Sequence, residues 1–170
     1  KSLKPMSKKK KNASQPKKFK NDHPLVLFKK SPIHGWGGFA RTEIRKGKRI
    51  IEYIGPKLTK KESEQELENL NCYVFTVNDD FDLDGSVKWN PARYLNHSCK
   101  PNCESDVKKD RVWIYSTKKI KKGQELTYNY GHELEDYEDR PCACGAKGCI
   151  GYMVAEEHFE TLKETEASLQ

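Results

Sequence analysis

Apolar sequence is scarce in this chain, and long apolar runs are missing. Only 35% of the 170 residues are hydrophobic. No window approaches the roughly 18 consecutive apolar residues that a membrane-spanning helix needs, so no membrane partner is expected. No apolar segment follows the basic N-terminus, so a secretory signal peptide is not expected either. The length still allows one small core, and we expect one domain with extensions.

Acidic residues are missing from residues 1–20, which hold nine lysines. The other 150 residues carry 23 basic and 25 acidic side chains, so the net charge of +7 comes from this segment. Like charges repel and leave little to bury, so we expect a disordered basic tail over residues 1–22. Its lysines suit nuclear targeting or weak contact with nucleic-acid phosphates, or they only aid solubility. The near-neutral remainder does not by itself predict a nucleic-acid binder.

Cysteines are few, but three of the six fall within PCACGAKGC, residues 141–149. In a secreted protein an even number of cysteines would indicate disulfides, and Asn12 and Asn96 each begin a glycosylation-type tripeptide. Without a secretory signal we favour reduced thiols that bind a metal ion.

A structural zinc ion is expected to take four thiolate ligands. The cluster above offers three: Cys142, Cys144 and Cys149. Within RYLNHSCKPNC, residues 93–103, Cys99 is the first candidate for the fourth ligand and Cys103 is its rival. Cys72 lies in a strand pattern, where a free cysteine usually packs as a small hydrophobic residue. Four thiolates leave no open coordination position, so the zinc would be structural.

Short strand patterns alternate with turns, which predicts a mainly β domain of small sheets. Strands are expected over 24–30, after Gly47, over 72–77, and on both sides of the turn at 121–123. Helices are expected over 59–70, where Thr59 and Glu62 form a capping box, and over 154–169. Residues 78–85 are expected to form an acidic turn.

A glycine-rich stretch, GWGGFA at residues 35–40, fits the dinucleotide-binding pattern G-x-G-x-x-A. No helical pattern follows it, so a Rossmann fold is excluded. Its glycines indicate a sharp bend or a close approach of the backbone to another group.

Several tyrosines stand in apolar surroundings: Tyr53, Tyr73, Tyr128 and Tyr130. One such tyrosine is usually a packed core residue. In a strand, Tyr128 and Tyr130 would point to the same face. A cluster of hydroxyl-bearing rings would suit a narrow channel that holds an aliphatic amine.

Six motifs in one order resemble those of SET domains that carry a post-SET zinc segment. They are SPIHGWGGFA, IEYIG, CYVF, ARYLNHSCKPNC, KGQELTYNYG and PCACGAKGC, within about residues 25–150. SET domains are S-adenosylmethionine-dependent protein-lysine methyltransferases, and the motifs are most similar to the trithorax-like histone H3 lysine 4 branch. The resemblance implies a SET domain of small curled sheets with a C-terminal pseudoknot over 23–131. A post-SET zinc segment over 132–153 and a helix over 154–170 would follow.

The resemblance also implies roles for individual residues. Tyr130 would be the catalytic tyrosine, Tyr53 would line the lysine channel, and Tyr128 would favour mono-methylation. The expected cofactor contacts are His34, Gly35, Trp36, Gly37, Tyr73, Asn96, His97 and Ala143. The expected zinc ligands are Cys99, Cys142, Cys144 and Cys149, and the zinc segment would form one wall of the cofactor pocket.

Two residues depart from the family pattern, and two stretches bear on the substrate. Gly38 replaces a large apolar residue, which is expected to loosen the cofactor loop, and Asn129 replaces the commoner Asp. The acidic stretches 78–84 and 133–139 would attract a basic peptide such as a histone tail, unless they are only solvated loops.

Other functions stay open at the level of sequence. The chain could methylate a non-histone basic protein or its own lysine tail. It could instead be a catalytically weak SET module that binds a partner, or a non-enzymatic zinc module whose tail binds nucleic acid. An activating protein partner would fit this type of SET domain. The lysine tail favours the nucleus, with the cytoplasm as the alternative.

Overall fold

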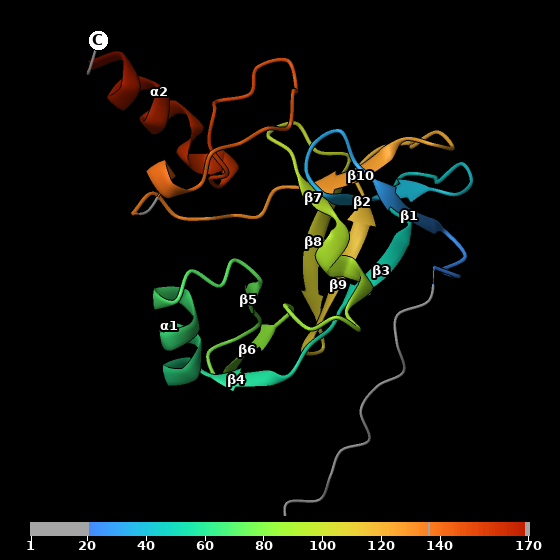
Figure 1. Ribbon diagram of the computed structural model, residues 1–170, viewed down its shortest axis with the longest axis horizontal. Coiled ribbons are helices and arrows are strands. Elements are labelled where there is room, and N and C mark those ends of the chain that lie inside the picture. The colour runs from blue at the N-terminus through green and yellow to red at the C-terminus, as the bar shows by residue number, and fades with distance from the viewer. Residues whose placement is uncertain (1–20, 136, 169–170) are drawn as a thin grey trace, which may run out of the picture.

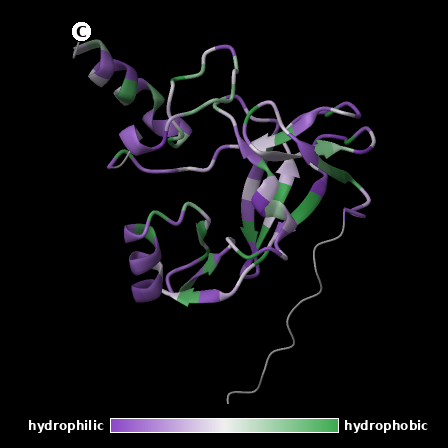
Figure 2. Ribbon diagram, in the orientation of Figure 1, coloured by the Kyte–Doolittle hydropathy of each residue, from purple (hydrophilic) through white to green (hydrophobic). Residues whose placement is uncertain are grey.

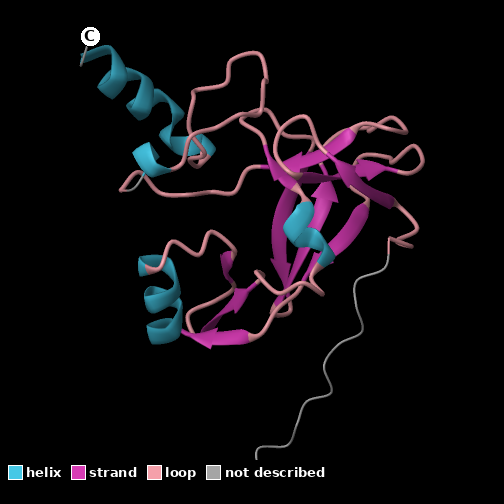
Figure 3. Cartoon of the chain, viewed as in Figure 1, coloured by secondary structure: helices cyan, strands magenta, loops and turns pink. Residues whose placement is uncertain are grey.

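Three small sheets make up most of the protein in the computed structural model, which describes residues 21–135 and 137–168 (Figures 1 and 3). The four-stranded sheet has the order β1 (Val26–Lys30), β2 (Trp36–Ala40), β10 (Glu125–Tyr128) and β7 (Asn96–His97). The second has the order β3 (Arg49–Tyr53), β9 (Arg111–Ser116) and β8 (Cys103–Lys108). The third has the order β4 (Lys57–Thr59), β6 (Phe81–Asp84) and β5 (Val74–Thr76). The predicted mainly β fold of small sheets is confirmed.

Strand β10 brings distant parts of the chain together. It pairs antiparallel with β2 and parallel with β7, so Tyr128 lies opposite His97 and Thr127 lies opposite Asn96. Asn102 fastens this arrangement, because its amide donates to the Glu125 carbonyl at 2.7 Å and accepts from the Thr127 N–H at 3.0 Å. The NHS stretch and the tyrosine motif are therefore neighbours, as a threaded C-terminal strand requires.

The core follows from strand alternation. In β9, Val112, Ile114 and Ser116 are buried, and the residues between them face outward. The same period of two is what a half-buried strand imposes on its side chains. Figure 2 shows apolar residues on these central strands and polar residues over the connections. Burying each large aliphatic side chain stabilises the fold by about 1.5–3 kcal/mol.

Helices lie on two outer parts of the chain. Helix α1 (Lys60–Glu68) begins at the predicted Thr59 cap, and the capping box with Glu62 is present. The predicted C-terminal helix begins later than expected. Residues 154–155 are extended, the 3₁₀ turn η3 (Glu156–His158) follows, and α2 (Phe159–Ser168) completes the segment. Leu162 of α2 is fully buried and fixes this helix to the rest of the chain.

One sequence prediction for the middle of the chain is wrong, and one strand was missed. Residues 78–85 are not simply a turn, because β6 occupies 81–84 and pairs with both β4 and β5. Its Asp82 is buried and forms an ion pair with Lys60 at 2.7 Å, so a charged residue stands where a strand pattern would have an apolar one. Strand β8 was not predicted either, because its outward positions are mostly polar.

Two short 3₁₀ turns and two negative findings complete the description. The turns are η1 (Pro91–Tyr94), capped by Asn90, and η2 (Tyr137–Asp139). The lysine-rich tail predicted over 1–22 falls outside the described residues except for Asn21 and Asp22. Within the part of the chain that the structure describes, no helix is long and apolar enough to cross a membrane.

Candidate functional site

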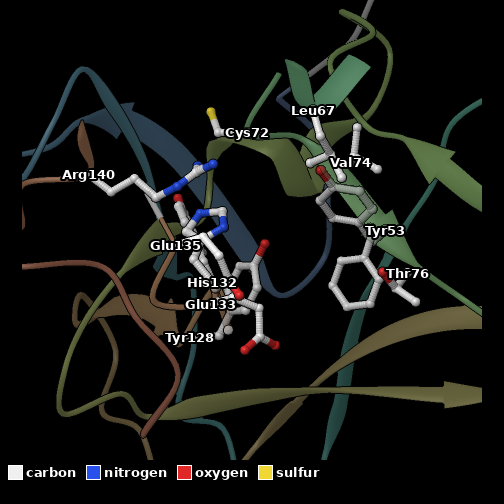
Figure 4. Close-up of a pocket in the computed structure, with 13 residues that line it drawn as sticks. Tyr53, Leu67, Cys72, Val74, Thr76, Tyr128, His132, Glu133, Glu135 and Arg140 are labelled. Carbon is white, nitrogen blue, oxygen red and sulfur yellow. The ribbon is translucent and has the colours of Figure 1, made fainter. Parts of the chain in front are cut away.

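Two cavities meet at Tyr130, and we name them by their walls. The tyrosine cavity, of about 430 Å³, is lined by Tyr53, Phe75, Tyr128, Tyr130, His132 and Glu135, among others (Figure 4). The cysteine cavity, of about 330 Å³, is lined by His34, Asn96, His97, Tyr130, Cys142, Ala143 and Cys144, with Ile33, Pro141 and Met153. Tyr130 is the described residue that lines both, so the two spaces adjoin at this position.

Aromatic rings define the tyrosine cavity. The ring centres of Tyr128 and Tyr130 lie 5.0 Å apart, and those of Tyr53 and Phe75 lie 5.3 Å apart. Figure 4 shows Tyr53 on one side of the cavity and Tyr128 on the other, with His132 beside the latter. These residues come from β3, β5, β10 and the segment that follows β10, so pairing of the sheets is what assembles the cavity.

Hydrogen bonds to backbone carbonyls hold two of the tyrosine hydroxyls. Tyr130 donates to the Leu95 carbonyl at 2.8 Å, and Tyr53 donates to the Tyr73 carbonyl at 2.8 Å. Burial raises the pKa of Tyr53, Tyr128 and Tyr130 far above the usual value for tyrosine, and neighbouring tyrosines add to the effect. All three hydroxyls are therefore neutral at physiological pH, and none can act as a tyrosinate base.

Gly85 explains the position of Tyr53. A Cβ atom at Gly85 would overlap the ring and hydroxyl of Tyr53. The Gly85 N–H also donates to the Tyr73 carbonyl at 3.0 Å, the same oxygen that receives the Tyr53 hydroxyl. Only glycine leaves space for the ring in this arrangement.

The floor of the cysteine cavity is organised by Asn96. Its side-chain amide donates to the His34 carbonyl at 3.3 Å, to the Trp36 carbonyl at 3.1 Å and to the Glu125 carboxylate at 2.8 Å. A Cβ at Gly37 would collide with the same carboxylate. The loop before β2 is thus fixed to β7 and β10 through one buried amide.

The predicted cofactor residues are placed unevenly. Four of them line the cysteine cavity: His34, Asn96, His97 and Ala143. Gly35, Trp36 and Gly37 do not line it. Gly35 lies in the loop before β2, and Trp36 and Gly37 begin β2, where the Trp36 carbonyl accepts from Asn96. Tyr73 lines neither cavity, and its ring packs under the guanidinium of Arg93 at 4.8 Å.

The sequence reasoning missed three residues that line the cysteine cavity, and in the tyrosine cavity it missed others such as Phe75, His132 and Arg140. Ile33 and Pro141 each lie next to a predicted residue, so their position in the chain was the available signal. Met153 gave no signal of its own. It reaches the cavity because its N–H donates to the Arg140 carbonyl at 2.9 Å, which folds the segment after the cysteines back on the one before them.

The structure shows which cysteine completes the four-cysteine cluster: it is Cys99. The sulfur atoms of Cys99, Cys142, Cys144 and Cys149 all lie within 4.8 Å of one another, so the cluster could hold a metal ion. Cys99 lies 3.7 Å from Cys142 and 3.7 Å from Cys149, sulfur to sulfur. A tetrahedron with zinc–sulfur bonds of about 2.3 Å has sulfur–sulfur edges of about 3.8 Å, so the donor set fits zinc.

The thiols of the cluster have pKa values shifted in both directions, and burial raises the pKa of Cys142 as well as that of Cys99. Burial acts to raise the pKa of Cys144, but hydrogen bonds from the backbone at Cys99 and Ala146 and from the neighbouring thiols outweigh it and lower the pKa to about 6. Burial raises the pKa of Cys99 to about 11. Four thiolates this close would repel one another, and a divalent cation would compensate their negative charge.

The two remaining cysteines are not part of the cluster. Cys103, the rival ligand, is buried in β8 and donates to the Asn102 side chain at 3.4 Å, and burial raises its pKa to about 12. Cys72 was expected to pack as a small hydrophobic residue inside a strand. That expectation is wrong, because Cys72 precedes β5, is exposed, and lines the tyrosine cavity.

His97 connects the cysteine cluster with Tyr130. Its Nδ1 accepts a hydrogen bond from the Tyr130 backbone N–H at 3.2 Å, which leaves the ring proton on Nε2. That Nε2 lies 3.6 Å from the Cys99 sulfur. Burial, with a smaller contribution from His132, lowers the pKa of His97 to about 4, so the ring is neutral. A metal ligand and the backbone of Tyr130 are therefore joined through one imidazole.

Sheets in this arrangement, the NHS–tyrosine pairing and the adjoining four-cysteine cluster define a SET domain with a post-SET segment. The SET domain family profile matches residues 35–131, so the chain belongs to the SET-domain family.

Within the SET-domain family, the chain is similar to several histone-lysine N-methyltransferases. The chain is 38% identical over 138 residues to histone-lysine N-methyltransferase 2D of Homo sapiens and 39% identical over 139 residues to histone-lysine N-methyltransferase set-2 of Caenorhabditis elegans. It is 36% identical over 152 residues to histone-lysine N-methyltransferase trr of Drosophila melanogaster. These alignments cover 75%, 76% and 83% of this chain, but only 2%, 9% and 6% of the relatives. The similarity to trithorax-type proteins is therefore confined to one domain of much longer chains.

Proposed function

We propose that this protein transfers a methyl group from S-adenosylmethionine to the ε-amine of a lysine in a basic protein such as a histone tail. The observation that carries the proposal is the position of Tyr130 between the two cavities. Methyl transfer joins two reactants that must meet in line, and a shared wall allows each to enter from its own side. The names of the curated relatives support the same activity.

The cysteine cavity is the proposed cofactor site, with His34, Asn96, His97 and Ala143 as contacts. Bound there, S-adenosylmethionine would supply a sulfonium methyl group, whose carbon–sulfur bond breaks towards sulfur as the nitrogen–carbon bond forms. Gly35, Trp36 and Gly37 would act through the loop that Asn96 fixes. Tyr73 would act through its carbonyl, which holds the Tyr53 hydroxyl.

The tyrosine cavity is the proposed lysine channel. A free lysine has a pKa near 10.4 and is mostly protonated, so the amine must lose a proton before it attacks. The hydroxyls around it are neutral, and burial together with Arg140 lowers the pKa of His132 to about 4, so His132 is neutral too. These residues therefore orient the amine and favour its uncharged form by desolvation, and the proton leaves to solvent.

Tyr130 and Tyr53 take different parts in this channel. Tyr130, fixed by the Leu95 carbonyl and by His97, would hold the reacting amine against the methyl group. Tyr53, across the cavity, would line the path of the lysine side chain. Tyr128 is fully buried beside Tyr130, and its hydroxyl would take space that a second or third methyl group needs, which favours mono-methylation.

Zinc is the proposed metal of the cysteine cluster. Cys99 comes from the end of the NHS motif, and the other three ligands come from the post-SET segment. A closed four-thiolate site would hold Cys142, Ala143 and Cys144 in place as a wall of the cofactor site, without a part in the chemistry.

A basic substrate is favoured by charge around the tyrosine cavity. Glu133 and Glu135 line it, and η2 contributes Glu138 and Asp139 close by in the chain. Acidic walls raise the rate at which a basic peptide associates. Histone substrates of this kind would place the protein in a nucleus, where an activating protein partner would raise a basal activity that the chain has by itself.

The decisive experiment incubates the purified full chain with labelled S-adenosylmethionine and core histones, with Tyr130→Phe in parallel. Label on a histone lysine that falls at least about 100-fold in Tyr130→Phe supports the proposal. Label confined to the protein itself would redirect the substrate to its own lysines. No transfer to any protein, with cofactor and zinc bound, would contradict an enzymatic function.

A further inference from the structure

Positive charge gathers on two connections that the proposed reaction does not use. Residues 41–49, RTEIRKGKR, join β2 to β3, and residues 117–122, TKKIKK, join β9 to β10. Together they hold nine basic residues and one acidic residue, Glu43. We call their basic side chains the basic surface. Residues 21–170 as a whole have more acidic than basic side chains, so this surface is a local concentration.

The backbone fixes the two connections side by side. Ile44 and Ile120 form an antiparallel bridge, and each N–H donates to the other's carbonyl at 2.9 Å. The Gly47 N–H donates to the Ser116 carbonyl at 2.7 Å, and the Ser116 hydroxyl donates to the Arg45 carbonyl at 2.6 Å. Both isoleucines are buried, so the connections are anchored in the core.

Most of the basic surface has no acidic partner. Among the residues that the structure describes, Lys119 pairs with Glu43 at 3.0 Å, and Arg49 lies over the Trp113 ring at 4.4 Å. Six other exposed basic side chains form no ion pair with a described residue: Arg45, Lys46, Lys48, Lys118, Lys121 and Lys122. Like charges held this close repel, and an anionic partner would relieve that repulsion.

The N-terminal lysines join the protein beside the same surface. Asn21 begins the described chain, and Arg41 donates to its carbonyl at 3.2 Å and to the His23 carbonyl at 3.0 Å. The nine lysines of residues 1–20 precede Asn21 in the chain. Figure 1 shows both connections at the end of the molecule away from α1 and α2.

We propose that the basic surface binds the phosphate backbone of a nucleic acid without reading its sequence. Phosphodiesters are anions spaced closely enough to meet several of these cations at once, with release of counterions. A bilayer is disfavoured because the apolar residues of the connections, Ile44 and Ile120, are buried and nothing apolar is left to insert. The surface also lacks the aromatic and aliphatic centre that a protein partner would need.

The test is a titration of the full chain with a fluorescent 30-base-pair DNA duplex, by anisotropy, between about 50 and 200 mM salt. The variant carries Arg45→Gln, Lys46→Gln, Lys121→Gln and Lys122→Gln. The matched control carries Lys61→Gln, Lys88→Gln, Lys109→Gln and Lys163→Gln, which are exposed elsewhere and change the net charge equally. All three proteins keep the N-terminal lysines, and circular dichroism with thermal unfolding checks that each is folded.

The expected result is a loss of affinity of roughly tenfold or more in the basic-surface variant, with a salt slope reduced by about 3 to 4. The control should stay within about threefold of the unmodified chain. Equal losses in both variants would overturn the proposal, because net charge alone would then explain binding. So would unchanged binding in the basic-surface variant, absence of binding at about 50 mM salt, or tighter binding to phosphatidylserine vesicles or polyglutamate than to DNA.

Discussion

Two unusual residues of the family pattern have partners that explain them. At Gly38, a Cβ would overlap Leu95 and approach Val26, so Leu95 occupies the space that a larger residue would fill. The cofactor loop is therefore packed at this point rather than loosened. At Asn129, the side chain accepts from the Gly131 N–H at 2.7 Å and donates to the Val154 carbonyl at 3.0 Å. An aspartate could make the first bond but not the second.

Asn129→Asp should weaken the attachment of the post-SET segment to the SET domain. The carboxylate would face the Val154 carbonyl oxygen without a proton to donate, at a cost of about 1–3 kcal/mol. Faster hydrogen exchange at residues 152–155, measured by mass spectrometry, would report the effect. The unmodified chain at the same pH serves as the reference, because Asn129→Gln would lengthen the side chain as well. Unchanged exchange would mean that the neighbouring His132–Val154 bridge suffices.

Tyr128→Phe should shift the product from mono- towards di- and trimethyl-lysine. Removing the hydroxyl opens space beside Tyr130 without disturbing the ring contact at 5.0 Å. Mass spectrometry of a substrate peptide over time measures the distribution. Abundant trimethyl product from the unmodified protein would contradict the assigned role of Tyr128.

Elements, rather than single residues, decide how far the sequence could predict the site. The sequence favoured Cys99 and kept Cys103 as its rival, and β8 decides between them because it turns Cys103 into the core and leaves Cys99 at the end of the NHS motif. The capping box at Thr59 was predictable because its hydrogen bonds are local. The Asp82–Lys60 pair was not, because it forms between β6 and α1.

The tyrosines show the same division. Tyr128 and Tyr130 are neighbours in sequence, but Tyr53 and Phe75 join them only when β3 and β5 are in place. The sequence motifs identified these tyrosines. The existence of two separate cavities could not be predicted from them, because the cavities form only when the strands pair. Met153 has no reactive or metal-binding group, so the sequence did not indicate a role for it. It lines the cysteine cavity because the segment after the cysteines folds back on the segment before them.

Removal of zinc should loosen the post-SET segment. A chelator is expected to remove one zinc per chain and to abolish S-adenosylmethionine binding, because the wall formed by Cys142 and Cys144 loses its support. Metal analysis and calorimetric titration with the cofactor measure both effects. Cys144→Ser should lower zinc content, whereas Cys72→Ser, at an exposed cysteine outside the cluster, should leave it unchanged. Full zinc content in Cys144→Ser would contradict the ligand set.

At the scale of the whole molecule, charge is separated although the body is nearly neutral. Glu133 and Glu135 line the tyrosine cavity, and the basic surface lies on the connections between β2 and β3 and between β9 and β10. A count of charges over residues 21–170 therefore could not reveal the basic surface. Its two halves are about 70 residues apart in sequence, and the Ile44–Ile120 bridge and the hydrogen bonds of Ser116 bring them together.

Glu135→Lys should raise KM for a basic peptide several-fold and leave kcat nearly unchanged. The reason is that Glu135 lines the entrance side of the tyrosine cavity but does not contact the tyrosine hydroxyls. Steady-state kinetics with a basic peptide and with a peptide of the same length but reduced charge would separate attraction from chemistry. Glu64→Lys, at an exposed position of α1, is a control that makes the same change of charge away from the cavity. An equal KM increase for both peptides would point to distortion of the cavity instead.

A single ring, Tyr130, stands between two cavities and is fixed from behind by His97. A ligand in either cavity would contact this residue, so we expect occupancy of one cavity to change the affinity of the other, and thermodynamic linkage requires that this influence be equal in both directions. A bisubstrate compound that passes this ring would gain affinity from both cavities at once, beyond what either half achieves alone.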